Sequence, residues 1–275
     1  MRGIDISFSQ PPASWWKAQF QAGYRVAVQD LWTGGYAGND GLKAVAATNL
    51  RHAREAGFKI AAYANASPPD WWPLATQMAE IKANAGSEWA NIDLVVVDVE
   101  LAGITMARVM ELADALEAAG KQADVLYTGS WFWTGHMGNS TDSRWKRFKL
   151  WPAQYDGVAD LSVRLFGPWA ATDVVGKQFA GTTELTGYAV DLNEFAEGFI
   201  REDGMATPEQ VQAALDAHQR VLDAFQTTLN GMQAALDAHQ KTLEAHQRAI
   251  DGRPAGGGVS EARAKELIRA AKHSI

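Results

Sequence analysis

Short apolar runs and longer amphipathic stretches alternate along residues 1–200. Residues 42–57 and 106–120 have apolar positions three and four apart and end in glycine, which is typical of helices. Strands that alternate with helices favour a parallel sheet, and eight of them favour a closed barrel. The expected strands span residues 3–8, 25–30, 59–64, 94–100, 123–128, 149–155, 174–179 and 188–193.

The pattern therefore predicts an α/β fold: an irregular (β/α) barrel of the TIM type. Irregularity is expected because loops, rather than clear helical patterns, separate the later strands. A doubly wound sheet is the main alternative. It usually carries a glycine-rich phosphate-binding turn after its first strand, and the stretch GIDISFSQPP has none.

A seven-residue repeat replaces this pattern in the last quarter of the chain, where residues 213–247 read AALDAHQ, RVLDAFQ, TTLNGMQ, AALDAHQ and KTLEAHQ. A sustained repeat of seven predicts a helix that forms a left-handed coiled coil, and hence a homo-oligomer. The expected organisation is a barrel domain at 1–200, a linker at 201–207, a coiled coil at 208–252, a Gly-rich linker at 253–258 and a short helix at 259–275.

Two features of the repeat leave alternatives open. His218, His239 and His246 lie on its seam, where they either set register and oligomer state or, in a symmetric oligomer, bind a metal. The dipeptide Asn230-Gly231 is either a weak point within one long helix or a turn that folds the segment into an antiparallel hairpin.

Composition narrows the classes of function. The 275 residues are 47% hydrophobic, which suffices for a substantial core, and no apolar stretch is long enough to span a membrane. A net charge of -7 with no basic cluster argues against nucleic-acid binding. There is no cysteine for a disulfide or a thiolate site. All eleven Trp precede residue 190, which supports a domain boundary near residues 201–207.

Acidic residues end several of the predicted strands. Asp98 and Glu100 are two apart, so both side chains would point to the same side of the strand, and their mutual repulsion would raise one pKa. Asp5 and Asp191 end the first and eighth strands, which are neighbours in a closed barrel. In such barrels the active site lies at the carboxyl ends of the strands. A protonated acid beside an ionised carboxylate is suited to the cleavage of a glycosidic bond.

The order and spacing of short motifs over residues 1–199 resemble the lysozymes of glycoside hydrolase family 25, which are muramidases. The motifs are GIDIS, NLRHAREAGFKIAAY, VVVDVE, LYTG, LWPAQYD, GPW before KQF, and VDLNEF. The resemblance implies hydrolysis of the β-1,4 bond between N-acetylmuramic acid and N-acetylglucosamine in peptidoglycan. It also implies that Glu100 is the general acid and Asp98 its nucleophilic or charge-stabilising partner, with Asp5 and Asp191 completing the acidic site.

The resemblance and the expected stacking of sugars on aromatic rings also indicate residues that bind substrate. These residues are Trp32, Tyr63, Tyr127, Trp151, Gln154, Tyr155 and Gln178. The chain departs from the family pattern at three places: VQDLWTGG replaces an Ala-Thr-Glu-Gly-like stretch, Ala64-Asn65 follows Tyr63, and Lys177-Gln178-Phe179 replaces Trp-Gln-Tyr. None of these departures removes a catalytic carboxylate.

Other interpretations fit the sequence less well. Family 18 chitinases carry Asp-x-x-Asp-x-Asp-x-Glu, and here Val96 occupies the second acidic position. A wall-binding module without turnover and a virion structural protein are the non-enzymatic alternatives. No metal or other cofactor is expected. The N-terminus lacks a secretion signal, and together with the appended heptads this favours a phage endolysin or virion-associated lysozyme, made in the host cytoplasm and acting on the cell wall.

Overall fold

In the computed structural model, eight strands close into a barrel in the order in which they occur along the chain. The structure describes residues 1–34, 39–68, 70–201, 208–251, 263 and 265–266. The strands are β1 (Arg2–Ile6), β2 (Val26–Trp32), β3 (Lys59–Asn65), β4 (Leu94–Asp98), β5 (Val125–Gly129), β6 (Lys149–Ala153), β7 (Gly176–Leu185) and β8 (Tyr188–Phe195). The predicted barrel is thus confirmed.

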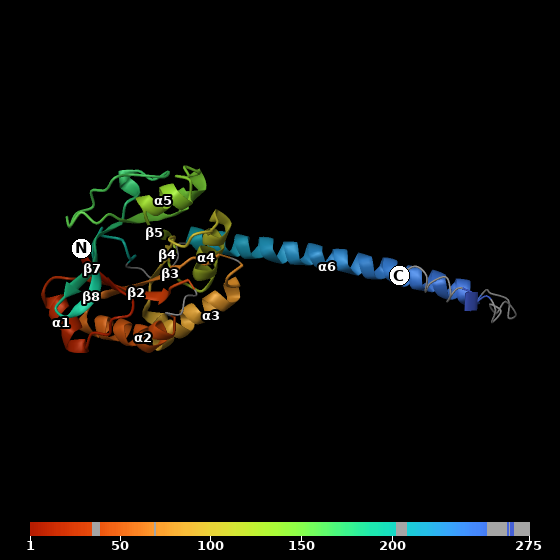
Figure 1. Cartoon of the computed structure of the whole chain (residues 1–275), viewed down its shortest axis with the longest axis horizontal. Coiled ribbons are helices and arrows are strands. Elements are labelled where there is room, and N and C mark those ends of the chain that lie inside the picture. Colours follow the sequence, from red (N-terminus) through yellow and green to blue (C-terminus); the bar gives the residue numbers. More distant parts are fainter. Residues whose placement is uncertain (35–38, 69, 202–207, 252–262, 264, 267–275) are drawn as a thin grey trace. The chain divides into compact units, whose positions relative to one another are not determined.

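Helices cover the outside of the barrel, and Figure 1 shows α1 to α4 around it. The α-helices of this unit are α1 (Ala13–Gln21), α2 (Asn39–Ala56), α3 (Leu74–Ala85), α4 (Met106–Ala118) and α5 (Ser130–His136). Short 3-10 helices are η1 (Gly86–Asn91), η2 (Ser143–Arg147) and η3 (Ala171–Asp173). Gly57 and Gly120 follow α2 and α4 with φ of 102° and 79°, a left-handed conformation in which glycine needs no strain.

Alternation along each strand separates two apolar layers. In β4, Leu94 and Val96 point into the barrel, whereas Val95 and Val97 pack with the helices outside. The interior layer also contains Val26, Val28, Ala61, Val125 and Trp151. Asp98 continues the inward-facing series and is 4% exposed, so the strand that fills the barrel also delivers an acid to its carboxyl end.

The eighth strand corrects the expectation of a fully parallel sheet. β1 to β7 are parallel neighbours, but β8 runs antiparallel to both β7 and β1. The reason is the two-residue turn between β7 and β8, in which Thr186 and Gly187 have φ of 48° and 88°. Such a turn joins only antiparallel strands. The β7–β8 hairpin therefore extends well beyond the predicted end of the seventh strand.

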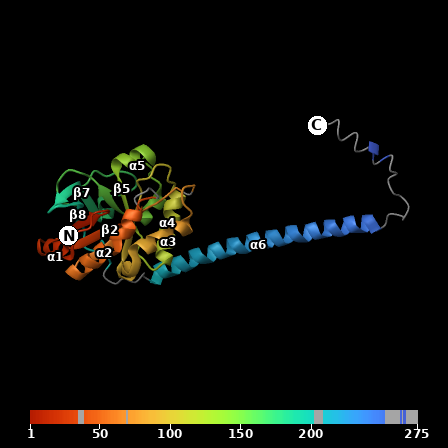
Figure 2. The same ribbon diagram turned by 60° about the horizontal axis from the view of Figure 1, so that its bottom comes forward.

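The heptad segment forms one helix, α6 (Pro208–Asp251), which continues through Asn230-Gly231 (Figure 2). The hairpin alternative is therefore not adopted. Gln side chains at a constant heptad position bond acceptors four residues later, as in the pairs Gln219–Asp223 and Gln233–Asp237. Chain contacts divide the protein into two compact units, residues 1–214 and 215–275. The proposed linker at 201–207 beyond Arg201, the linker at 253–258 and most of the final helix at 259–275 lie outside the described residues.

Candidate active site

Five buried or half-buried acids come together at one end of the barrel. Asp5, Asp30 and Asp98 lie in β1, β2 and β4, Glu100 follows β4, and Asp191 lies in β8. Asp5 and Asp191 are direct partners in the β1–β8 ladder. β4 ends at Asp98, so Glu100 belongs to the segment after the strand, while Val99 packs in the outer layer. The structure therefore brings the four predicted acids together and adds Asp30.

Gln178, on β7, lies at the centre of this cluster and is 2% exposed. Its Nε2 donates to Asp5 Oδ2 at 3.0 Å and to Asp191 Oδ2 at 3.1 Å. Its Oε1 accepts from the hydroxyls of Tyr127 at 2.7 Å and Tyr155 at 2.8 Å. One amide thus fixes the positions of two acids and two tyrosines from four different strands or loops.

Asn193 supports the same network from β8. Its Nδ2 donates to Asp5 Oδ2 at 2.6 Å, and its Oδ1 accepts from Trp151 Nε1 at 3.0 Å. Burial raises the pKa of Asp5 to about 8, and the charge of Asp191 acts in the same direction. The amide donors oppose this rise, but they carry no charge and so do not offset the desolvation of the carboxylate.

Asp98 and Glu100 form a pair of acids at the end of β4, and the pKa of each is raised. Burial raises the pKa of Asp98 well above its ordinary value, and the Glu100 carboxylate raises it further. Burial also raises the pKa of Glu100 to about 7, against a hydrogen bond from the Gly129 backbone N–H. Asp98 Oδ1 and Glu100 Oε1 are buried and have no hydrogen-bond partner among the described residues. The pair can therefore share a proton near neutral pH and has free acceptor atoms for a ligand.

Asp30 is an acid of this site that sequence reasoning missed. It is 3% exposed, and burial raises its pKa to about 7 despite hydrogen bonds from the Trp32 backbone N–H and from Tyr63. Its charge also raises the pKa of Asp98. The sequence did contain a signal for Asp30: it lies near the end of the apolar run RVAVQDLW, as the other acids lie near the ends of their strands.

The aromatic residues divide into buried supports and exposed rings. Trp32 and Trp151 are each 1% exposed, so neither can stack on a sugar as expected, and both are corrected to core residues. Trp32 donates to Ser67 Oγ, and Trp151 packs inside the barrel against Tyr127. By contrast, Tyr155 and Trp131 are 60% and 57% exposed after β6 and β5. These two rings are open to a ligand.

Tyr63 and Gln154, which were also predicted to bind substrate, differ in their distance from the acids. Tyr63 is half-buried and its hydroxyl reaches Asp30 inside the barrel end. Gln154 does not join the acidic cluster: its Nε2 donates to Asp156 Oδ2 at 2.7 Å and its Oε1 accepts from the Arg164 N–H. Gln154 therefore orders its own loop, and its contact with substrate stays a prediction.

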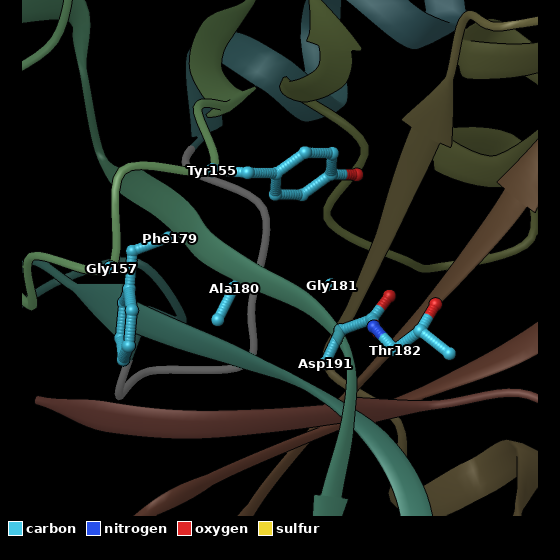
Figure 3. A pocket seen from close by; sticks show the side chains of 7 residues that line it. All are labelled: Tyr155, Gly157, Phe179, Ala180, Gly181, Thr182 and Asp191. Atoms are coloured by element: carbon cyan, nitrogen blue, oxygen red, sulfur yellow. The ribbon is translucent and has the colours of Figure 1, made fainter.

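A pocket of about 470 Å³ adjoins the cluster at Asp191. Figure 3 shows Tyr155 on one side of it and Asp191 with Thr182 on the other. The Thr182 backbone N–H donates to Asp191 Oδ1. The pocket combines an exposed aromatic ring, backbone amides and a carboxylate, a combination that suits a polar ligand with flat C–H faces, such as a sugar.

Comparisons with known proteins agree with this geometry. The sequence profile described as "Glycosyl hydrolases family 25" matches residues 4–187. No curated protein matches the chain. A solved structure with a similar fold is GHIP of Streptococcus pneumoniae, described as a glycosyl hydrolase 25 and a virulence factor participating in host cell invasion. It shares 18% identity at a TM-score of 0.50, over 74% of this chain and 90% of its own. With a profile match over most of its length and an acid-lined barrel end, this chain belongs to family 25 of the glycosyl hydrolases.

Proposed function

We propose that this glycoside hydrolase is an N-acetylmuramidase that cleaves the β-1,4 bond between N-acetylmuramic acid and N-acetylglucosamine in peptidoglycan. The observation that carries the proposal is the Asp98–Glu100 pair, held at the barrel end with both pKa values raised. The family supplies the substrate class, and the exposed rings of Tyr155 and Trp131 supply surfaces on which sugars can stack.

Glu100 is the proposed general acid. It is half-buried, whereas Asp98 is 4% exposed, so Glu100 is the member of the pair that can reach a glycosidic oxygen. A pKa of about 7 keeps a large fraction of Glu100 protonated at neutral pH, which a general acid requires. Proton transfer from Glu100 to the leaving oxygen breaks the bond to the anomeric carbon.

Asp98 is the proposed partner of the positive charge that develops at the anomeric centre. The reactive form is the one in which the proton shared by the pair lies on Glu100 and Asp98 is ionised. As Glu100 gives up this proton, the charge of Asp98 stabilises the anomeric centre, either through space or by bonding to it. Gln178 holds Asp5 and Asp191 beside this centre, and Asp191, whose charge raises the pKa of Asp5, is the member of the two that supplies negative charge. A negative field favours an oxocarbenium-like transition state over a neutral ground state.

The chain is also proposed to assemble through α6. Leu222, Phe225, Leu229, Met232, Leu236 and Leu243 are 51%, 66%, 55%, 59%, 62% and 53% exposed along the heptad seam. A helix that exposes apolar residues at heptad spacing is stabilised by a second copy of itself. Copies joined in this way would bind a polymeric wall with higher avidity. Action at the cell wall, in phage lysis or wall penetration, is part of the same proposal.

Mass spectrometry of fragments released from defined peptidoglycan tests the proposed bond. Reducing-end N-acetylmuramic acid is the expected product. Reducing-end N-acetylglucosamine would show that the other glycosidic bond is cut and would overturn the assignment. The anomer formed first, followed by NMR, reports whether configuration is retained or inverted.

Among the described helices, none combines the length and the apolar character needed to cross a lipid bilayer.

A further inference from the structure

A buried lysine lies directly behind the active site. Lys177 precedes Gln178 on β7, and its side chain is 1% exposed. Successive residues of a strand point in opposite directions, so Gln178 faces the acids while Lys177 faces away from them. Its Nζ lies 2.8 Å from Asp156 Oδ2 and 2.9 Å from Asp160 Oδ1.

Both acids belong to the loop that follows β6, here defined as residues 154–164. Each acid also organises the loop locally: Asp156 accepts from the Val158 N–H and Asp160 from the Ser162 N–H. The Gly157 N–H donates to the Phe179 carbonyl, which ties the loop backbone to β7. Lys177 is therefore the buried centre of a contact between this loop and the barrel.

Tyr155 is the residue of this loop that reaches the active site. Its hydroxyl donates to Gln178 Oε1, and its ring lies close enough to Gly181 that a Cβ there would meet it at 3.1 Å. Tyr155 and Gly157 form one wall of the pocket beside Asp191 (Figure 3). Movement of the loop would therefore open this pocket and remove one hydrogen bond from Gln178.

The lysine of this contact is more deeply buried than the two acids. Asp156 and Asp160 are 35% and 45% exposed, whereas Lys177 is almost fully enclosed. Hydrogen bonds from Lys177 lower the pKa of both acids, to about 2 for Asp156. Removing the lysine leaves two acids that water can solvate, whereas removing both acids leaves a buried charge without a partner.

We propose that Lys177 is a positioning residue: its bonds to Asp156 and Asp160 hold the 154–164 loop against β7, so that Tyr155 closes the glycan pocket beside Asp191. The glycan part of this inference rests on the proposed function. The loop part does not, because it concerns the free protein.

The first test compares K177M with the matched control K149M. Lys149 forms an exposed ion pair with Asp173 at 3.1 Å, so K149M removes the same kind of bond elsewhere on the surface. Hydrogen exchange by mass spectrometry should speed up at least about fivefold in residues 155–164 of K177M and remain unchanged in K149M. Equal exchange in K177M and the wild type would overturn the proposal, whatever the enzyme's substrate.

The second test separates positioning from stability. In D156N/D160N, Lys177 keeps its buried charge without a counter-ion, which should lower Tm and raise KM for purified walls about tenfold, with kcat within about twofold. The triple variant K177M/D156N/D160N removes the buried charge and should recover Tm, yet its KM should stay high because the loop remains unheld. Recovery of KM together with Tm would show a purely structural role. If the wild type does not hydrolyse walls at all, the proposed function fails, and loop exchange alone decides the role of Lys177.

Discussion

Asp5 and Asp191 lie directly opposite each other in the antiparallel pairing of β1 with β8, and the amide of Gln178 donates to both. Burial raises the pKa of both carboxyl groups, and the charge of Asp191 raises that of Asp5 further. Each group therefore keeps its proton to a higher pH than a solvated carboxyl group does, and its ionisation in the folded chain lowers stability.

Stability should fall as pH rises because of Asp5. Its folded-state pKa of about 8 exceeds its ordinary value of 3.8, so the folded chain keeps a proton that the unfolded chain releases between these values. The stability that this proton provides is present at low pH and is lost as pH rises toward about 8. D5N should therefore be more stable than the wild type by about 1–3 kcal/mol at pH 8, with no gain near pH 4. Thermal unfolding at both pH values measures this, and a gain independent of pH would contradict it.

Glu100→Gln should reduce wall lysis by about 10²–10⁴-fold, because the amide cannot donate a proton to the leaving oxygen. Tm should be unchanged or higher, since the substitution removes a carboxyl whose pKa burial has raised. Turbidity loss of purified walls measures the activity, with circular dichroism as the check on folding. Lysis near the wild-type rate would identify another residue as the acid.

Asp30→Asn should shift the pH profile of the enzyme to lower pH. Asp30 raises the pKa of Asp98, so removing its charge lets the Asp98–Glu100 pair lose its shared proton earlier. The alkaline limb of kcat/KM should move down by roughly 0.5–1 pH unit. Asp93→Asn is the control, because Asp93 is exposed just before β4, at the opposite end of that strand from Asp98. Coincident profiles for D30N and the wild type would exclude the electrostatic role of Asp30.

Trp131→Ala should weaken binding to walls without unfolding the protein. The ring is 57% exposed beside Gly129, whose N–H bonds Glu100, so a sugar near Glu100 can stack on it. Loss of the stacking surface should raise KM about fivefold to tenfold, or about 1–1.4 kcal/mol. The contrasting variant is Trp32→Ala, which removes a buried ring and should lower the free energy of unfolding by about 3–5 kcal/mol. An unchanged KM for W131A would remove Trp131 from the binding surface.

Leu229→Asp with Leu236→Asp should convert an oligomer into a monomer. Both side chains lie on the exposed seam of α6, and buried aspartates would be unpaired in a coiled coil. Sedimentation equilibrium of the full chain measures the mass. Lys241→Glu, off the seam on the same helix, should leave the mass unchanged. A monomeric wild type at micromolar concentration would refute assembly through α6.

Local sequence patterns predicted most of the barrel, because each strand by itself shows which of its alternating residues are buried inside the barrel. The series Leu94, Val96 and Asp98 shows how: two apolar residues fill the interior, and the next inward position is an acid at the open end. The placement of Asp5 beside Asp191 also followed, since barrel closure makes the first and last strands neighbours. These inferences need only strand periodicity and order along the chain.

The features that were not predicted depend on contacts between residues far apart in the chain, and local sequence patterns do not contain such contacts. The direction of β8 was decided by the conformation of Thr186 and Gly187, and the burial of Trp32 and Trp151 by which face of the barrel wall each ring occupies. Gln178 became the centre of the site only because four separate segments place oxygen atoms around one amide. The amino-acid sequence by itself determined the repeating barrel, the heptad helix and the acids at strand ends, because these follow from side-chain periodicity. Only the tertiary structure decided which carboxyl groups share a desolvated space, because burial, the largest cause of each raised pKa, comes from segments distant in the chain.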